Sequence, residues 1–179
     1  MKKNLLLIIS ITLTFNGLVA QNWTRYKSED LAFVAMYPSQ PERTVQKIPS
    51  AVGELDMHMI MYAPQSGDNN TLYSVIRSDY PKEQFEGADV TYNNNVLDAA
   101  LEGAVTNVSG KLLKDKKIVF NGYSGRSIKI EIQAGFIYMN AYLVGHIMYI
   151  TQVITLTNND GNTSIDKFFS SFDILNVKN

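Results

Sequence analysis

Cysteine is absent from the 179-residue sequence, and this absence limits how the chain can be stabilised and anchored. Disulfides are permitted in exported proteins, but this chain cannot form one, so the burial of apolar surface must stabilise its fold. A chain without cysteine also lacks the lipid-modified cysteine that anchors bacterial lipoproteins. Both a disulfide scaffold and a lipoprotein are therefore excluded.

Histidine is also scarce, and His58 and His146 are the two present. A serine or threonine nucleophile would have to take one of them as its base. The run Gly122–Arg126 is similar to a nucleophile elbow, but Arg126 stands where that motif requires its last glycine. A β-turn between two strands accounts for these glycines, and His146, which follows Gly145 in a second turn, is expected to be solvated. We therefore expect no catalytic residue and no enzyme activity.

No excess of one charge sign is present, because 16 Lys and Arg against 17 Asp and Glu leave a net charge of −1. Lys111 to Lys117 is the one basic cluster of the sequence, and Asp115 interrupts it. Proteins that bind nucleic acid or anionic lipid through charge present a larger basic surface. The charge pattern therefore predicts no nucleic-acid partner.

No apolar run of the sequence reaches the length of a membrane span, and the one at the N-terminus follows positive charge. Two lysines precede the uncharged run Leu5–Leu13, and Ala20 follows as a small residue at a cleavage position. This order is that of a secretory signal peptide. The run is shorter than the about 20 apolar residues that span a bilayer, which disfavours the alternative of a retained anchor. We predict a signal peptide at 1–20 and one domain at 21–179, periplasmic or secreted, with no membrane span after cleavage.

Most of the remaining chain alternates apolar and polar residues with the period of a β-strand. The alternation is clearest at 33–37, 55–61 and 127–132. Two later runs, Phe136–Val144 and Ile147–Leu156, are apolar on both faces, which is typical of central strands covered on both sides. Short glycine-containing turns would join the last three strands into an antiparallel meander.

Two segments have helical periodicity instead. Apolar residues recur every three or four positions from Asn95 to Val108, with Asp89 or Thr91 as N-cap and Gly110 at the end. A second, short helix carries one apolar stripe after its cap. The fold class expected is α+β, an antiparallel sheet of about seven or eight strands with one longer and one short helix packed on it. The candidate caps and the stripe of the short helix are Thr163, Ser164, Ile165, Phe168, Phe169 and Phe172.

One strand has side chains that could bind a metal ion. Glu54, Asp56 and His58 leave the same face, and carboxylates with histidine bind zinc or other divalent ions. The strand's alternation explains the same residues as a solvent-facing surface, because its other face carries methionines. Zinc sites usually draw ligands from more than one element, so we expect no metal here.

The loop 158–162 is rich in Asn, Asp and Gly and is superficially similar to a calcium loop. Leu156 and Lys167 occupy its first and last ligand positions, where an EF-hand requires Asp and Glu. Turn geometry between a strand and a helix accounts for the loop's composition. We therefore expect no bound metal and no cofactor.

Methionine and tyrosine side chains could line an apolar groove. Tyrosine is common in binding surfaces because it joins a large apolar body to a polar tip. Burial in the sheet core is the alternative for the same residues. The candidates are Met57, Met59, Met61, Tyr138, Tyr142 and Tyr149.

Four short motifs occur in order along the chain: an opening strand that ends in Pro-x-x-Pro, a Gly-x-x-Gly-Arg turn, paired strands, and a closing helix. They lie at Leu31–Pro41, Gly122–Arg126, Tyr142–Tyr149 and Phe168–Phe172. Their order resembles that of exported bacterial domains similar to the PsbP-like superfamily. The resemblance implies an antiparallel sheet sandwiched by helices, and an accessory factor or binding module rather than a catalyst. It carries no functional residue over, and Asn140 stands where many members have arginine.

Two hypotheses of function remain from the sequence. The first is an exported, non-catalytic module that binds a protein or envelope partner through one sheet face. The second is a carrier of small apolar ligands, with a groove between the sheet and the 95–108 helix. A deep apolar pocket under that helix would favour the carrier, and a flat exposed aromatic patch would favour the module.

Removal of the leader can be tested directly. We predict that the mature protein begins at or near Gln21 and is soluble, because the positive start, the apolar run and Ala20 have the order of a signal peptide. N-terminal sequencing of protein from a cell-envelope fraction measures the cleavage position. Recovery of intact Met1–Lys3 in membranes would contradict the prediction.

Overall fold

The computed structural model of the chain describes residues 22–50 and 53–175. These residues form two antiparallel β-sheets, two α-helices and two short 3-10 helices. The large sheet has seven strands in the spatial order β3-β4-β5-β9-β8-β7-β6. In chain order its strands are β3 (Glu42–Ser50), β4 (Gly53–Tyr62), β5 (Asn70–Asp79), β6 (Lys111–Phe120), β7 (Tyr123–Ile132), β8 (Gly135–Val144) and β9 (Ile147–Leu156).

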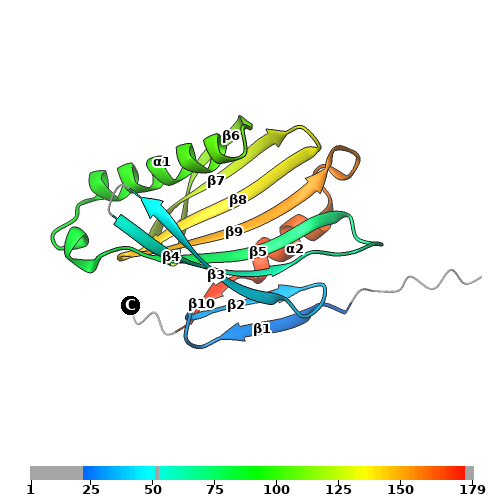
Figure 1. Ribbon diagram of the computed structural model, residues 1–179, viewed down its shortest axis with the longest axis horizontal. Helices are drawn as coiled ribbons and strands as arrows, with labels where there is room; N and C mark the ends of the chain where they lie inside the picture. The colour runs from blue at the N-terminus through cyan, green and yellow to red at the C-terminus, as the bar shows by residue number, and fades with distance from the viewer. Residues whose placement is uncertain (1–21, 51–52, 176–179) are drawn as a thin grey trace, which may run out of the picture.

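The small sheet and the helices cover the two faces of the large sheet. In Figure 1 helix α1 lies on one side of the large sheet, and α2 lies with the small sheet on the other side. The small sheet has the order β1-β2-β10. None of the described helices is long and apolar enough to cross a membrane. The remaining elements are β1 (Thr24–Ser28), β2 (Phe33–Tyr37), η1 (Lys82–Phe85), α1 (Val90–Asn107), η2 (Thr157–Asn159), α2 (Thr163–Ser171) and β10 (Asp173–Ile174).

The expected α+β class is confirmed, and β7, β8 and β9 form the expected antiparallel meander. Strand β9 is the central strand of the large sheet, and β8 lies next to it, as their two-sided apolar composition predicts. The strand at 33–37 lies in a separate sheet, which strand periodicity cannot reveal. Its partners, β1 and β10, come from before it and from near the C-terminus.

Helix α1 begins at Val90, directly after the first of the two caps expected, Asp89, and the apolar stripe from Asn95 occupies its later turns. The Asp89 carboxylate accepts a hydrogen bond from the Tyr92 amide at 2.8 Å, which confirms Asp89 as N-cap. At the other end Ser109, and not Gly110, adopts a positive φ of 49°. Gly110 is required for another reason, since a Cβ there would lie 2.4 Å from Ile130 Cγ2.

Helix α2 is capped by Asn162, so the expectation of a Thr163 or Ser164 cap is wrong. The Asn162 side chain accepts from the Ser164 amide at 3.1 Å, and both hydroxyl residues belong to the first turn. The expected apolar stripe is confirmed: Phe168 is fully buried, and Phe172, which follows the helix, is 4% exposed.

Aromatic side chains fill the space between the two sheets. We call the face of the large sheet that bears Tyr73, Tyr142 and Tyr149 the aromatic face. Phe168 reaches it from α2, with ring centroids 5.4 Å from Tyr73 and 5.2 Å from Tyr37 of the small sheet. Edge-to-face pairs at these distances stabilise the contact beyond the burial of apolar area.

The opposite face, which we call the α1 face, is packed by aliphatic residues. Leu97 and Leu101 of α1 are buried. Leu101 contacts the β7 residues Ile128 and Ile130, and Leu97 belongs to the cluster that includes Leu143. The α1 contacts concentrate on β7 and β8. The helix therefore covers the β7 and β8 side of this face.

Phe168→Ala tests whether the α2 stripe is structural. We expect the free energy of unfolding to fall by about 3–5 kcal/mol, because truncation removes a fully buried ring that contacts both sheets. Phe169→Ala is the matched control, since Phe169 is half-buried and should cost less. Urea unfolding measures both. A midpoint for Phe168→Ala within error of wild type would instead assign the stripe to a partner surface.

Candidate functional site

The methionines and tyrosines proposed for one groove lie on opposite faces of the large sheet. Met59 stands opposite Ile76, and Ile76 stands opposite Ile150, on the α1 face. Tyr142 and Tyr149 stand opposite each other on the aromatic face. A common groove is therefore excluded, because side chains leave alternate faces along each strand.

Two of the three tyrosines belong to the core, and Tyr138 is half-buried against it. Tyr142 and Tyr149 are at most 5% exposed, and burial raises the pKa of both phenols. Tyr149 donates a hydrogen bond to the Leu31 carbonyl at 2.9 Å, and the Tyr142 ring stacks on Phe172 with centroids 5.7 Å apart. These two side chains join the sheets and cannot form an exposed aromatic patch.

The methionines, in contrast, remain partly exposed on the α1 face. We call this surface the methionine face and define it by five half-buried residues of β4 and β5: Met57, Met59, Met61, Leu72 and Ile76. None of the five is among the residues that pack against the three buried clusters of the described chain. The face is therefore apolar without belonging to the core.

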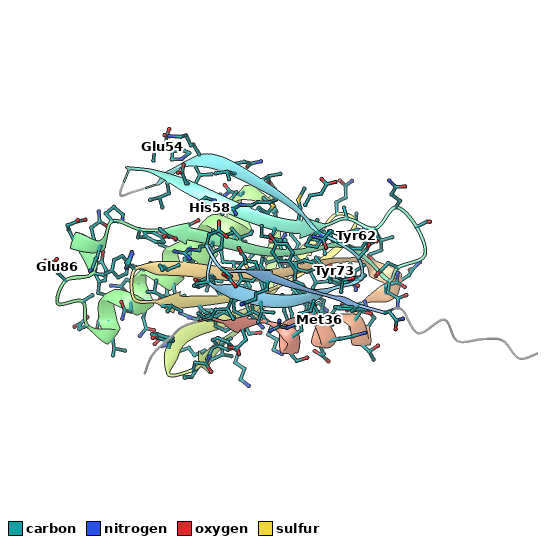
Figure 2. All side chains as sticks on the ribbon, turned by 90° about the horizontal axis from the view of Figure 1, so that it is seen from below. Met36, Glu54, His58, Tyr62, Tyr73 and Glu86 are labelled. Carbon is teal, nitrogen blue, oxygen red and sulfur yellow. The ribbon has the colours of Figure 1, made fainter. Side chains whose placement is uncertain are left out.

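The three residues proposed as metal ligands share a surface at one end of β4. Figure 2 shows Glu54 and His58 along this strand, away from Tyr73 in the core. Glu54 forms an ion pair with Lys47, with 2.8 Å between Oε1 and Nζ. His58 Nδ1 lies 3.5 Å from Arg43 Nη2. A polar cavity of about 460 Å³ adjoins them. The ion pair of Glu54 and the exposure of Asp56 match the solvent-facing interpretation.

Both histidines approach Asp79, which sequence spacing did not predict. The Tyr80 amide donates to the His146 carbonyl at 2.9 Å, and this bond holds the β8–β9 turn beside the end of β5. The Arg77 guanidinium that donates to Asp79 lowers the pKa of its carboxyl, and the nearby charges of His146 and His58 lower it further. Strand pairing, and not chain proximity, brings these groups together.

A metal site does not emerge at this end of the sheet. Among residues 22–50 and 53–175, no group of three His, Cys, Asp or Glu side chains is arranged to hold an ion. This geometry does not test a metal requirement in solution, so the absence of one stays a prediction.

The Gly122–Arg126 run is a turn only in its first part. Asn121 and Gly122 have positive φ values of 49° and 83°, and β7 begins at Tyr123. Gly125 lies within the strand, where a Cβ would come 2.6 Å from the Ala141 carbonyl oxygen. This close approach requires glycine, and the next residue, Arg126, points under α1.

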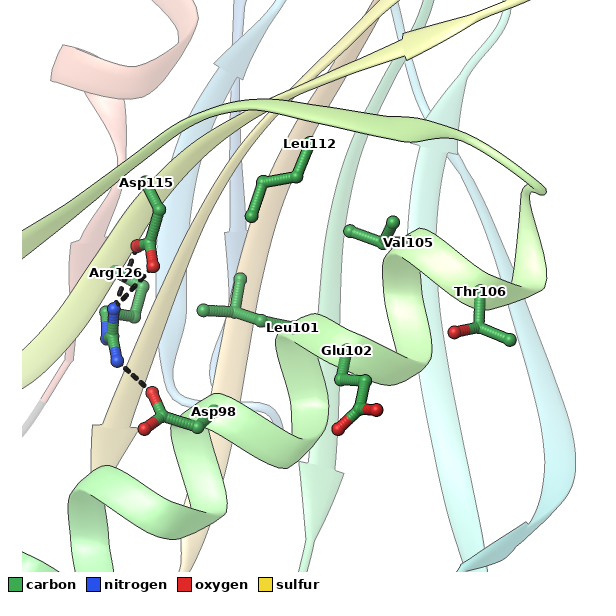
Figure 3. Close-up of a pocket in the computed structure, with 8 residues that line it drawn as sticks. All are labelled: Asp98, Leu101, Glu102, Val105, Thr106, Leu112, Asp115 and Arg126. Atoms are coloured by element: carbon green, nitrogen blue, oxygen red, sulfur yellow. Dashed lines mark hydrogen bonds and ion pairs between the residues drawn. The ribbon is translucent and has the colours of Figure 1, made fainter.

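Arg126 joins three elements beneath α1. Its side chain is 10% exposed, and its Nη1 donates to both Asp115 carboxylate oxygens, at 2.7 and 2.9 Å. Its Nη2 donates to Asp98 of α1 (Figure 3). The arginine thereby connects the helix to β6 and β7 through charge-assisted hydrogen bonds to two carboxylates. Sequence analysis missed this role because Asp98 and Asp115 are distant in the chain.

A cavity of about 380 Å³ lies beside Arg126, under the helix where the carrier hypothesis places its groove. Leu101 and Leu112 form apolar parts of its wall, as Figure 3 shows. Three carboxylates and one guanidinium also line it, including Glu102. The size suits a small ligand, but an apolar molecule would desolvate these charges. The cavity is therefore not the purely apolar pocket that the carrier hypothesis expects, although apolar atoms form most of its accessible wall.

The loop at 158–162 has a structural role. Asp160 accepts hydrogen bonds from Lys129 and Tyr138, both at 2.6 Å. Asn162 caps α2, and its amide also donates to Asn70 Oδ1 at 2.8 Å. These contacts confirm a strand-to-helix loop that ties the end of β9 to its neighbours.

The Arg126 connection predicts non-additive mutational effects. Asp98→Asn and Asp115→Asn each leave the guanidinium one carboxylate, whereas the double variant leaves its buried charge uncompensated. We expect the double variant to lose about 3–5 kcal/mol of unfolding free energy, more than the sum of the single losses. Urea unfolding of the cycle measures this coupling. Glu102→Gln, an exposed neighbour on α1, is the control, and equal losses in all variants would contradict the prediction.

Comparison with known proteins bears on the fold alone. No family model and no curated protein matches the sequence. Among solved structures, the solution structure of cyanobacterial PsbP (CyanoP) from Synechocystis sp. PCC 6803 is similar, with a TM-score of 0.59 and 14% sequence identity. The match covers 88% of this chain and 95% of that chain. The chain therefore has a PsbP-like fold, as the order of its motifs predicts.

Proposed function

We propose that this chain is an exported, non-catalytic module that binds a partner protein through the methionine face. The observation that carries the proposal is the position of Met57, Met59 and Met61, which are half-buried side by side yet lie outside the buried clusters. Large contiguous apolar patches on the surface of a soluble protein mark interaction sites.

The width of the sheet explains why this surface stays open. A helix is about 10–12 Å across with its side chains, and neighbouring strands are about 4.8 Å apart, so one helix covers about two strands. Helix α1 covers β7 and β8. Strands β4 and β5 lie beyond β9 in the sheet, and the five residues of the methionine face are left partly exposed there.

The shape and chemistry of the methionine face favour a protein over a small ligand. Its residues spread over two neighbouring strands, and neither of the cavities at β4 and under α1 is lined by a methionine. Methionine side chains are flexible and polarisable, which lets them pack against an irregular partner surface. A partner with aliphatic or aromatic side chains would bury the residues of the methionine face that the fold leaves half-buried.

Two observations support a non-catalytic role. Neither histidine shares a hydrogen bond with a serine or threonine hydroxyl within the described ranges, so the base of a hydroxyl nucleophile has no partner there. Ser124, the serine of the elbow-like run, lies in β7 opposite Val119 and not at a sharp strand-to-helix turn. Export rests on the leader at 1–20, which lies outside the described residues.

Site-specific photo-crosslinking tests the proposed function. A photoreactive residue at Met59 should give one discrete protein adduct in a cell-envelope extract. The matched control is the same residue at Val45, which is 51% exposed on the other face of the neighbouring strand and should give none. Excess wild-type protein should compete the adduct away, whereas a Met57→Lys/Met61→Lys variant should not.

Urea unfolding must first show that the variants remain folded. Equal adducts at both positions would contradict a specific surface. A bound small molecule in native mass spectrometry of the wild type, lost in the Met57→Lys/Met61→Lys variant, would replace the protein partner by a ligand.

A further inference from the structure

Strand β6 forms one edge of the large sheet and presents that edge to solvent. Its hydrogen-bonded neighbour within the described ranges is β7 alone. Every side chain from Lys111 to Lys117 is exposed, and Val119 is 76% exposed. An edge strand of this length offers unpaired backbone N–H and C=O groups to another strand.

The same strand carries uncompensated positive charge. Asp115, which interrupts the basic cluster in the sequence, is bound by Arg126 on the α1 face. The lysines of the strand form no ion pair with any described residue. Those lysines are Lys111, Lys114, Lys116 and Lys117. The structure therefore converts a mixed-charge segment into a basic edge.

We propose that β6 accepts an extended acidic segment of a partner protein as an additional strand of the large sheet. Main-chain hydrogen bonds would bind the segment, and the lysines would select acidic side chains. The exposed Leu112 and Leu113, 43 and 44% accessible, would contact apolar residues between the acidic ones. A second copy of β6 is disfavoured because lysine would face lysine.

The register favours a strand over a membrane surface. Lys116 stands opposite Ser127 and Lys117 opposite Arg126, so consecutive lysines leave opposite faces of the sheet. They would flank both sides of an added strand, whereas a flat bilayer would meet one side. This edge lies at the opposite side of the sheet from β4 and does not depend on the proposed function.

Fluorescence anisotropy of the mature chain with a labelled peptide tests the proposal. The probe is a peptide of about eight residues that alternates valine and glutamate, a length that suits one strand. Its control alternates proline and glutamate, which keeps the charge but removes alternate N–H donors and the extended conformation. We expect the valine peptide to bind about tenfold more tightly, and amide hydrogen exchange along β6 to slow on binding.

Charge variants identify the surface. A Lys114→Gln/Lys116→Gln/Lys117→Gln variant should bind the valine peptide about tenfold more weakly and with less dependence on salt. A matched variant should retain wild-type affinity within about twofold, and urea unfolding confirms that both fold. It changes three exposed lysines of other elements: Lys27→Gln, Lys47→Gln and Lys82→Gln.

Two results would overturn strand addition. One is equal binding of the valine and proline peptides, or binding without slower exchange along β6. The other is binding to phosphatidylglycerol vesicles, lost in the Lys114→Gln/Lys116→Gln/Lys117→Gln variant, with no binding of the valine peptide. The second result would assign the edge to an anionic membrane.

Discussion

Phe168 and Phe172 occupy the space between the small sheet and the large one, and the packing of the two sheets on each other depends on that contact. Phe172 lies 5.7 Å from Tyr142 and 6.1 Å from Phe33 between ring centroids, so one side chain touches both sheets. The two sheets share no strand in the described chain, so side-chain packing must hold them together. Phe168 belongs to α2 and Phe172 follows it directly, and the next strand, β10, pairs with β2. The aromatic face is therefore completed by the last elements of the chain.

The small sheet and α2 cover the aromatic face, so α1 is the helix left to cover the opposite face. A seven-stranded sheet needs cover on both faces wherever its strands are apolar on both sides. One helix of ordinary diameter spans about two strands, and α1 lies over β7 and β8. Met57, Met59 and Met61 then remain as apolar surface that the chain itself does not bury. The proposed partner surface is thus a consequence of sheet width and helix number.

The packing of α1 on the sheet also decides which charged side chains form ion pairs. Arg126 lies beneath α1, where two carboxylates from different elements compensate a side chain that is 10% exposed. That pairing removes the negative charge of Asp115 from the solvent-facing edge of β6. A structural ion pair inside the fold therefore shapes the charge of the neighbouring surface, where the lysines of β6 form no ion pair with any described residue.

The sequence by itself determined the local elements: the meander of β7 to β9, the amphipathic stripes of both helices, the Asp89 cap and the α+β class. These depend on side-chain periodicity and on hydrogen bonds within a few residues, which a short window of sequence contains. Tertiary structure alone decided that the strand at 33–37 joins a second sheet, that the methionines and Tyr142 lie on opposite faces, and that Asp98 and Asp115 meet at Arg126. The reason is that strand order and register place residues from distant segments side by side, and neither is encoded in the local pattern of any one segment.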